Sequence, residues 1–239
     1  IRDGILLERS KGTPQGGVIG PLLANLFLHY AFDLWMKKTF LGVEFCRYAD
    51  DGLVHCKTKE EASYIKDRLT KRFREFGLEL NEKKTRIVYC KDKLRVQDYR
   101  IISFDFLGYT FRPRLSHSIT KKEFFVNFSP AVSKASIKSM SQEMKRWKIN
   151  LRSSQFIEDF SRMYNPVLRS WWHYYGFFHK SAMTVVFNQL NRILVKWAKK
   201  KYKILHRSKT RASKWLTKAA RKKRELFIHW QLGIFPAAE

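Results

Sequence analysis

The apolar residues of the N-terminal third change their spacing from one stretch to the next. After Pro21 they recur every three or four residues as far as Trp35, which predicts an amphipathic helix of roughly 15 residues. Residues 43–56 differ: their short apolar runs predict two strands, and Asp51-Gly52 is a typical hairpin turn. The pattern therefore predicts a helix followed by a hairpin.

A second helix and further strands follow. Helical spacing returns over residues 62–76, and Gly77 stands where a C-terminal cap is expected. The apolar positions within 78–88 again indicate strand structure. The apolar segment 104–111 contains a glycine and is closed by Arg-Pro-Arg at 112–114, which predicts another hairpin against the same sheet. This order of elements is typical of a mixed α+β part.

The second half of the chain has a helical pattern. Strand signals stop after about residue 128, and Ser129-Pro130 is a good helix start, with serine as cap and proline in the first turn. Three apolar stripes follow, and Pro166 predicts a break or kink near Asn165 in the second. The stripes are Ile137, Met140, Met144 and Trp147; Phe156, Phe160, Met163, Val167 and Trp171; and Val186, Leu190, Ile193, Leu194 and Trp197. We expect a small helical bundle.

Charge is the strongest compositional feature. The 239 residues hold 48 Lys and Arg against 21 Asp and Glu, a net charge of +27, and residues 121–239 carry 26 basic against 6 acidic side chains. Residues 196–224 hold 14 basic residues and no acidic one, interleaved with Trp197, Tyr202 and Trp215. Such a run repels itself unless a polyanion neutralises it, so we predict a phosphate-binding surface with aromatic anchors. A solvated charged face and a membrane surface are the alternatives.

The remaining composition narrows the class of protein. With 44% hydrophobic and 15% aromatic residues, the chain can build a core and is no disordered basic tail. Its three cysteines have neither disulfide nor zinc-finger spacing, which favours a reducing compartment. No apolar run reaches the ~18 residues that a membrane span needs. We therefore predict a cytoplasmic protein that associates with nucleic acid and with no membrane.

Two segments carry candidate chemistry. Asp50 and Asp51 stand side by side at the predicted hairpin tip. Magnesium is typically bound through one or two carboxylates plus substrate phosphate oxygens, although Asp-Asp-Gly is also ordinary turn chemistry. Residues 12–17, Gly-Thr-Pro-Gln-Gly-Gly, lead into the first helix, and glycines there permit close approach of the backbone to a ligand. A simple turn before a helix is the alternative.

Together these two segments resemble the central motifs of reverse transcriptases. The run of residues 12–29, from Gly-Thr-Pro-Gln-Gly-Gly to Leu-Phe-Leu-His, is similar to the bacterial group II intron type. Residues 77–85 resemble the next family motif, 104–109 the primer-grip hairpin, and 165–176 the maturase-specific region. By this resemblance the chain is identified as a group II intron-encoded reverse transcriptase/maturase, its C-terminal part, without the N-terminal fingers and the first catalytic Asp motif.

The resemblance implies a role for each matching residue. Asp50 and Asp51 would be catalytic ligands of a two-metal Mg²⁺ site, and Lys84 would stabilise the leaving pyrophosphate. The nucleotide and template pocket would use Pro14, Gln15, Gly16, Gly17 and Tyr48, and the primer grip would use Phe106, Leu107, Gly108 and Tyr109. A solvated loop is the alternative for Lys84, and ordinary sheet packing for the grip.

The implied fold class is α+β. A partial polymerase palm, an antiparallel sheet with packed helices, would occupy residues 1–118, and an all-α thumb and maturase-specific bundle 119–195. A basic helical segment that binds nucleic acid would occupy 196–239. The residues expected to contact RNA are Arg169, Lys180, Lys199, Lys200, Lys201, Arg207, Arg211 and Lys214.

The implied function is RNA-directed DNA synthesis combined with splicing of a mobile group II intron. The family supplies another Asp from an earlier strand, and Asp3 lacks the surrounding apolar strand pattern. We therefore expect a fragment that is inactive in synthesis by itself, so its standing as a nucleotidyltransferase is left open. The implied partners are group II intron RNA, a DNA target and primer, dNTP in the complete enzyme, and a missing N-terminal half; the implied compartment is the bacterial cytoplasm.

Two other functions compete with this one. A non-catalytic RNA-binding maturase module that assists splicing needs surface contacts rather than carboxylates. A viral RNA-dependent RNA polymerase shares paired aspartates, but it predicts neither the Pro-Gln-Gly-Gly segment nor the Trp- and Tyr-rich region of residues 165–176.

Overall fold

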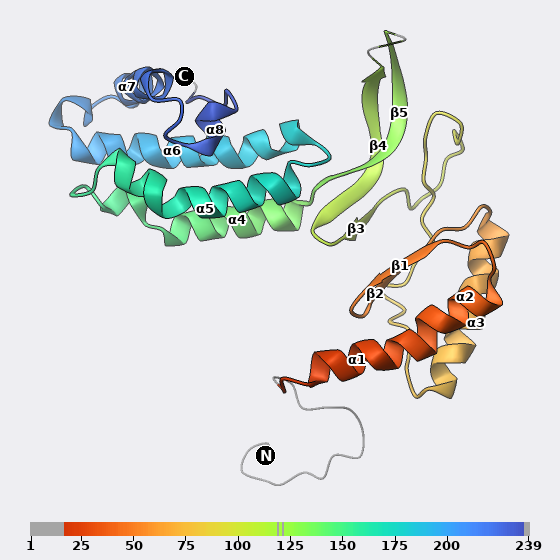
Figure 1. Ribbon diagram of the computed structural model, residues 1–239. Coiled ribbons are helices and arrows are strands. Elements are labelled where there is room, and N and C mark those ends of the chain that lie inside the picture. The colour runs from red at the N-terminus through yellow and green to blue at the C-terminus, as the bar shows by residue number, and fades with distance from the viewer. Residues whose placement is uncertain (1–16, 119, 121, 237–239) are drawn as a thin grey trace. The chain divides into compact units, whose positions relative to one another are not determined.

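The computed structural model describes residues 17–118, 120 and 122–236. The chain forms two compact units that divide between Ile87 and Val88. Two small antiparallel sheets precede a bundle of helices in the sequence (Figure 1). This arrangement confirms the predicted fold class, a mixed α+β part followed by an all-α part.

A long helical segment is the first element among the described residues of the first unit. It comprises α1 (Gly20–Leu28), one π-helical turn (His29–Asp33) and α2 (Leu34–Thr39). Pro21 occupies the first turn of α1, where its missing N–H is not needed. The segment is therefore longer than the helix that the apolar spacing predicts, and it contains a π-helical turn that no sequence signal indicates.

The second helix of this unit, α3 (Lys59–Glu75), has predictable ends. Thr58 caps its start, since the Thr58 hydroxyl accepts a hydrogen bond of 3.1 Å from the N–H of Glu61. Gly77 follows its end with a φ of +68°, a conformation that glycine adopts without strain. The predicted glycine cap is thus confirmed.

The first sheet is a hairpin of β1 (Phe45–Tyr48) and β2 (Asp51–Val54). Tyr48 pairs with Asp51, so the turn residues are Ala49 and Asp50, and the predicted Asp51-Gly52 turn is wrong. Ala49 takes the positive φ of +52°, because the strand register rather than the Asp-Gly signal sets the position of the turn.

A small apolar core holds the first unit together. Phe32, Met36 and Ile65 are buried, and partly buried side chains that include Phe45 and Phe73 pack around them. Phe32 meets Phe45 edge to face at 5.3 Å between ring centroids. The hairpin therefore lies against the π-helical turn, which carries Phe32.

The strand predicted within residues 78–88 is absent from the described structure. This stretch has no regular secondary structure, and Asn81 closes a turn by accepting from the N–H groups of Lys84 (3.0 Å) and Thr85 (2.8 Å). Apolar residues alone do not make a strand: their backbone groups need a paired neighbour, and no ladder is formed here.

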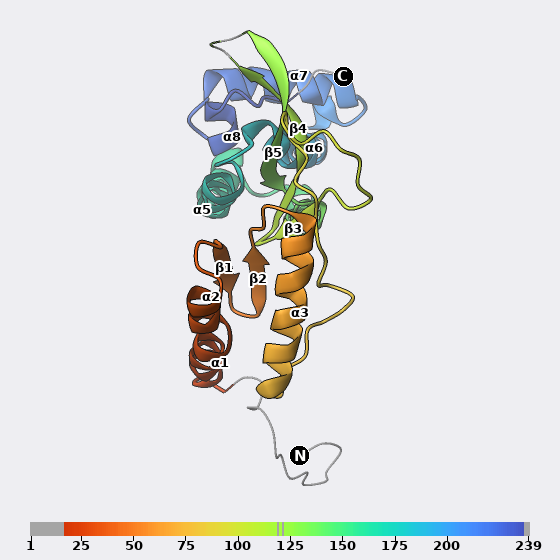
Figure 2. The ribbon, with the colours of Figure 1, turned by 90° about the vertical axis from the view of Figure 1, so that its right-hand side faces the viewer.

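The second unit contains a three-stranded antiparallel sheet in the order β3 (Phe104–Phe106), β4 (Tyr109–Ser118), β5 (Glu123–Val132). The two longer strands form an extended ribbon (Figure 2). Pro113 lies inside β4 rather than closing a hairpin; β3 pairs with β4 only as far as Phe111, so the proline lies where β4 has a single neighbour.

The bundle starts later than predicted. Ser129 and Pro130 belong to β5, opposite Arg112 and Phe111, so the predicted helix start there is wrong. Ser133 caps the first helix instead, accepting a hydrogen bond of 3.0 Å from the N–H of Ser136. The helices are α4 (Lys134–Arg146), α5 (Ile157–Tyr175), α6 (Thr184–Lys201), α7 (Lys209–Lys222) and α8 (Ile228–Gln231), with short 3-10 turns between several of them.

α4, α5 and α6 lie side by side and share one core (Figure 1). The predicted first and third stripes lie on the buried faces of α4 and α6, but the second is out of phase: Ile157, Tyr164 and Leu168 are buried, whereas Phe156 is exposed. α5 also continues across Pro166, so the helix does not break at the position where a break or kink was predicted. α6 runs through residues 195 and 196, the predicted boundary of the basic segment.

One polar cluster is fully enclosed in this core. Asn191 on α6 accepts through Oδ1 from the indole N–H of Trp230 (3.0 Å) and lies 2.9 Å from Nε2 of His229. The shared acceptor requires a proton on Nε2, which leaves Nδ1 without a hydrogen-bond partner among the described residues. Burial lowers the pKa of His229 to about 3, so the imidazole is neutral.

Candidate functional site

The carboxylate pair lies on the β1–β2 hairpin of the first unit. Asp50 is in the two-residue turn and Asp51 is the first residue of β2; both are exposed, as is Tyr48 across the turn. The described structure thus places three of the predicted site residues together. Because nothing covers the two carboxylates within this unit's described residues, they are free to accept a ligand from solution.

Arg47 fixes the turn that carries Asp50. Its guanidinium donates to both carboxylate oxygens of Asp33 (2.9 and 2.7 Å), to Oδ1 of Asn25 (3.0 Å) and to the carbonyl of Ala49 (2.8 Å). One side chain therefore ties the hairpin turn to α1 and to the π-helical turn. These hydrogen bonds lower the pKa of Asp33 and raise that of Arg47, so the pair stays ionised.

Sequence reasoning missed this network. Arg47 and Asp33 lie 14 positions apart, and Arg47 and Asn25 lie 22 apart, so no local pattern pairs them. Asp33 is also the last residue of the π-helical turn, which no sequence signal indicates.

The donor set at the hairpin fits a hard divalent cation. Two adjacent carboxylates match magnesium, which uses one or two carboxylates and completes its shell with water and substrate phosphate oxygens. Within residues 17–118, 120 and 122–236, however, no group of three or more His, Cys, Asp and Glu gathers to form a complete metal site. A metal ion bound at this hairpin would therefore need further ligands from a substrate or from another segment.

The other residues predicted for this site lie in different places. Pro14, Gln15 and Gly16 lie outside the described residues. Gly17 is exposed, and its carbonyl accepts from the N–H of Gly20 at 3.2 Å in the turn that starts α1. Lys84 is exposed in the turn at Asn81, where its N–H lies 3.2 Å from Oδ1 of Asn81.

In the second unit the predicted primer-grip residues form the tight β3–β4 turn. Leu107 and Gly108 have φ values of +49° and +77°, and Phe106 pairs with Tyr109. This is the geometry of a two-residue turn with two left-handed positions. The four predicted residues are therefore contiguous at one end of the three-stranded sheet.

This turn is docked on α4 and α5 through its backbone. The Gly108 carbonyl accepts from the Ser133 N–H and the Ser136 hydroxyl, each at 2.9 Å. The Tyr174 hydroxyl donates to the Leu107 carbonyl at 2.9 Å, and the Tyr109 hydroxyl donates to the Tyr174 carbonyl. Burial raises the pKa of Tyr109, which stays a hydrogen-bond donor. The bundle thus fixes the orientation of the grip hairpin.

The predicted aromatic anchors of the basic segment are part of the fold. Trp197 is fully buried, and its indole N–H donates to the Arg152 carbonyl at 3.1 Å. Tyr202 and Trp215 are half-buried, and their rings contact each other at 4.8 Å between centroids with an angle of 51° between the planes. The prediction that Trp197 anchors nucleic acid is wrong, because α6 turns this side chain into the bundle core.

Most basic residues predicted to contact RNA are exposed. The exposed ones are Arg169, Lys180, Lys200, Arg207, Arg211 and Lys214, whereas Lys199 and Lys201 are half-buried. Lys201 donates to the carbonyls of Ser153 (3.0 Å) and Gln155 (2.9 Å) and lies 4.2 Å from the centre of the Phe156 ring. It therefore ties the end of α6 to the turn before α5.

A basic stripe runs along α7. Arg211, Lys214, Lys218 and Arg221 recur at spacings of three and four and are all exposed, while the opposite face buries Ala212, Ser213, Leu216 and Ala220. We call these four cations the α7 stripe. Lys218 and Arg221 are not among the residues predicted to contact RNA, although the sequence shows the helical spacing of these basic positions.

Comparisons with known proteins agree with this arrangement. Residues 5–111 match the family model "Reverse transcriptase (RNA-dependent DNA polymerase)", which spans the carboxylate hairpin and the grip turn. Residues 137–216 match the model "Group II intron, maturase-specific domain", which spans most of α4 to α7. The chain belongs to the group II intron reverse transcriptase/maturase family. The first model describes polymerases, which act on nucleic acid and usually use divalent metal ions as cofactors.

A curated relative of this reverse transcriptase/maturase is protein YkfC of Escherichia coli (strain K12). The two are 28% identical over an alignment of 132 positions that covers 41% of this chain and 34% of YkfC. The match thus spans about a third of the length of that relative. Among the helices of the described residues, none is long and apolar enough to cross a membrane.

Proposed function

We propose that this chain joins the metal-binding and primer-gripping hairpins of an RNA-directed DNA polymerase to an RNA-binding maturase module. The observation that carries the proposal is the pairing of each family match with a fitting surface. The reverse transcriptase match holds the exposed carboxylate pair, and the maturase match ends within the α7 stripe. In functional terms, residues 1–118 are the palm part, 119–195 the thumb and maturase-specific part, and 196–239 the basic segment.

The polymerase part depends on residues that hold and orient other groups. Asp50 and Asp51 hold Mg²⁺, and Arg47 keeps their turn in place through Asp33. The chemistry that such ions supply when bound is activation of a primer hydroxyl and stabilisation of the leaving oxygens. Lys84 balances charge on the leaving pyrophosphate.

The substrates are placed by the remaining residues. Pro14, Gln15, Gly16, Gly17 and Tyr48 line the nucleotide and template pocket, and Phe106 to Tyr109 hold the primer. DNA primer, dNTP and target DNA are the partners of this activity, and a further carboxylate has to come from another segment.

The maturase part binds the intron RNA through phosphate contacts. Arg169 lies on α5, and Lys180 begins the 3-10 turn that follows this helix. The other predicted residues belong to the basic segment: Lys199, Lys200, Lys201, Arg207, Arg211 and Lys214. Cations on a helix surface neutralise phosphates and release counterions, which makes the binding strongly dependent on salt.

A second candidate function is RNA binding in support of splicing without DNA synthesis. The small number of metal donors favours this second function. Among the described residues, no third acidic, His or Cys side chain joins Asp50 and Asp51. Splicing support needs only the RNA-binding surface.

RNA titration tests the maturase part. The purified chain is titrated with a structured group II intron RNA and with an unrelated duplex over a salt series. We expect tight binding that prefers the intron RNA; equal, salt-sensitive binding to both would contradict a maturase role.

A pair of charge variants locates the RNA surface. Replacing Arg211, Lys218 and Arg221 by Gln should lower the slope of log K against log salt by about 2–3, because each lost phosphate contact removes about 0.7–0.9. The matched control replaces the exposed Lys66, Arg68 and Lys71 of α3 by Gln, which removes as much charge from the other unit. An equal fall of this slope in both variants would contradict a specific RNA-binding surface on α7.

A synthesis assay separates the two candidate functions. The chain is given a primer annealed to an RNA template, dNTP and Mg²⁺, and compared with the Asp50→Ala, Asp51→Ala variant. Synthesis that the variant abolishes, with RNA affinity unchanged within about twofold, supports the polymerase. Absent synthesis with intact, intron-preferring RNA binding supports the second candidate.

A further inference from the structure

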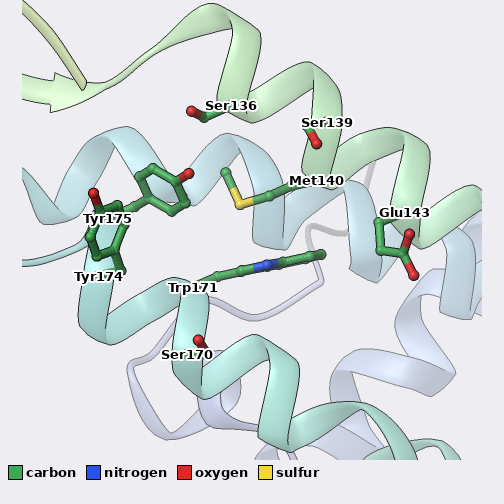
Figure 3. A pocket seen from close by; sticks show the side chains of 8 residues that line it. All are labelled: Ser136, Ser139, Met140, Glu143, Ser170, Trp171, Tyr174 and Tyr175. Atoms are coloured by element: carbon green, nitrogen blue, oxygen red, sulfur yellow. The ribbon is translucent and has the colours of Figure 1, made fainter. Parts of the chain in front are cut away.

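An open pocket of about 370 Å³ lies between α4 and α5, beside the docked grip turn (Figure 3). Ser139 and Glu143 reach it from α4, and Ser170 and Trp171 reach it from α5. The volume is within the ~300–1,000 Å³ that is typical of small-ligand sites, near the lower end. None of the residues already placed in the carboxylate hairpin or in the α7 stripe lines it.

One wall of the pocket is the end of an aromatic stack. Tyr164 and Trp147 stack at 4.1 Å between centroids with an interplanar angle of 10°, and Trp147 and Trp171 follow at 5.7 Å and 9°. Tyr164 and Trp147 are buried, whereas Trp171 is only half-buried and lines the pocket. A rigid, planar surface is thus presented to an incoming flat ring, and aromatic side chains of this kind bind bases by stacking.

The polar lining favours a base over a phosphate. Glu143 is the one ionised side chain of the lining, in a protein of net charge +27. Its carboxylate is held by the indole N–H of Trp147 (3.2 Å) and by Arg146 (3.3 Å). A carboxylate repels a phosphate and accepts from an amino group, and the hydroxyls of Ser139 and Ser170 have no hydrogen bond within the described part of the chain.

Cations lie just outside the pocket on the same two helices. Lys138 precedes Ser139, Arg146 follows Glu143 by one turn, and Arg169 precedes Ser170; all three are exposed. A nucleotide whose base enters the pocket thus has cations on both sides for its phosphates. The arrangement matches the way in which proteins recognise unpaired RNA, with a stacked base inside and a neutralised backbone outside.

We propose that this pocket binds one unpaired nucleobase of RNA, stacked on Trp171 with its amino edge at Glu143. The proposal rests on the RNA-binding function proposed above and adds a base-reading site to it. The carboxylate acceptor selects bases that carry an amino group, namely adenine, guanine and cytosine, over uracil.

The test uses the full chain and a short oligo-uridine RNA with 2-aminopurine at one position, whose fluorescence falls when it stacks. The wild-type chain should quench it and bind it more tightly than the all-uridine strand. Ser139→Leu with Ser170→Leu fills the pocket from two exposed positions and leaves the aromatic stack in place. This variant should lose the quenching and bind the probe roughly tenfold more weakly, with unchanged binding of a duplex.

Three further variants sharpen the result. Trp171→Leu should lose quenching and Trp171→Phe should restore most of it, since phenylalanine retains a stacking face. Glu143→Gln should keep the quenching and reduce the preference for the amino base. As control, Lys218→Gln with Arg221→Gln on α7 should weaken binding of the probe and the all-uridine strand equally and keep the quenching.

Two outcomes would overturn the proposal in different ways. If the pocket-filled variant quenches and binds like the wild-type chain, the base does not enter this pocket, while the RNA-binding function stands. If the wild-type chain binds neither strand, the proposed RNA-binding function fails and the base site fails with it.

Discussion

The two tight hairpins of this molecule differ in which of their polar groups are left without a partner in the described part of the fold. At the β1–β2 turn the backbone is held by one guanidinium, that of Arg47, and the carboxylates of Asp50 and Asp51 are left exposed. At the β3–β4 turn the carbonyls of Leu107 and Gly108 are occupied by hydroxyl and amide donors of the bundle. Hairpins with turns of equal length thus leave acidic side chains open to solvent in one unit and dock their backbone on helices in the other.

The two units that contain these hairpins also differ in the size of their cores and in how deeply their ionisable groups are buried. The first has a small core around Phe32, Met36 and Ile65, and its ionised pair, Arg47 and Asp33, lies near the surface. The second encloses a neutral imidazole, His229, with Asn191 and Trp230 in an extensive core. Stability should therefore respond to acid at different pH values in the two units.

The largest effect is expected from His229. In the unfolded chain its pKa is about 6.5, and in the fold burial lowers it to about 3. Below pH 6.5 the unfolded chain binds a proton that the folded one does not, so stability is lost as the pH falls from about 6.5 toward 3. We expect a loss on the order of 3 kcal/mol between pH 7 and pH 4, measured by urea unfolding with tryptophan fluorescence.

His229→Gln should flatten this dependence, and the exposed His206→Gln should leave it intact. Six of the seven tryptophans lie in the second unit, so the fluorescence reports mainly on that unit. An unchanged slope in His229→Gln would show that the acid sensitivity comes from other groups.

The next largest effect on stability is expected from Gly108→Ala. Gly108 has a φ of +77°, and an added Cβ would lie 3.0 Å from both the Ser136 and Tyr175 hydroxyl oxygens. Left-handed strain costs about 1–2 kcal/mol and the crowding adds to it, so we expect the unfolding free energy of the second unit to fall by about 2–3 kcal/mol. Urea unfolding measures it.

Gly233→Ala is the matched control in the same unit. Its φ is +81°, but no atom lies within 4 Å of an added Cβ, so only the left-handed strain of about 1–2 kcal/mol is expected. If both variants lost the same unfolding free energy, the contacts of Gly108 with α4 and α5 would not add to the cost of the substitution.

A smaller effect is expected at Arg47. Arg47→Met removes the donors of Asp33 and should destabilise the first unit by about 1–3 kcal/mol. Because the pKa of Asp33 is lowered in the fold, this contribution is present above the unfolded value near 3.9 and is lost as the pH falls through the folded value. Hydrogen exchange of the hairpin amides at neutral pH measures the loss.

A double-mutant cycle with Asp33→Asn isolates the pair. We expect the two losses to be non-additive, and Arg47→Lys to recover little, because an ammonium cannot replace the two-pronged contact. Additive losses would contradict the view that this pair holds the turn.

The smallest change in stability is expected at the carboxylates themselves. Asp50→Ala with Asp51→Ala should shift the unfolding free energy by less than about 0.5 kcal/mol, since both side chains are exposed. The same variant should abolish binding of Mn²⁺, used as a probe of the divalent site and followed by electron paramagnetic resonance. Unchanged Mn²⁺ binding would place the metal elsewhere.

The sequence predicts what local signals determine. The cap at Gly77, the extent of α3 and the inward stripes of α4 and α6 follow from capping and helical spacing, and all are found. The position of the carboxylate pair on a hairpin also follows, although strand register moves the turn by two residues.

Long-range contacts account for what the sequence misses. Ser129-Pro130 has a valid helix start, but pairing with β4 keeps it in a strand. The sequence around Trp197 suggests a surface anchor, but the packing of α6 in the bundle buries this side chain. The partners of Arg47 lie 14 and 22 residues away along the chain. The pocket at Trp171 likewise needs α4 and α5 to meet.

The burial of α8 has a consequence for how the basic segment meets its ligand. Phe227 and Trp230 are fully enclosed after α7, and Trp197 is enclosed before it, so the α7 stripe is anchored in the core at both ends. Its cations therefore keep a fixed spacing before any ligand arrives, and binding requires no coupled folding of this helix. Association should show little of the heat-capacity change that accompanies ordering of a flexible basic tail. Affinity should then depend on the geometry of the phosphates presented to the helix, and not on their number alone.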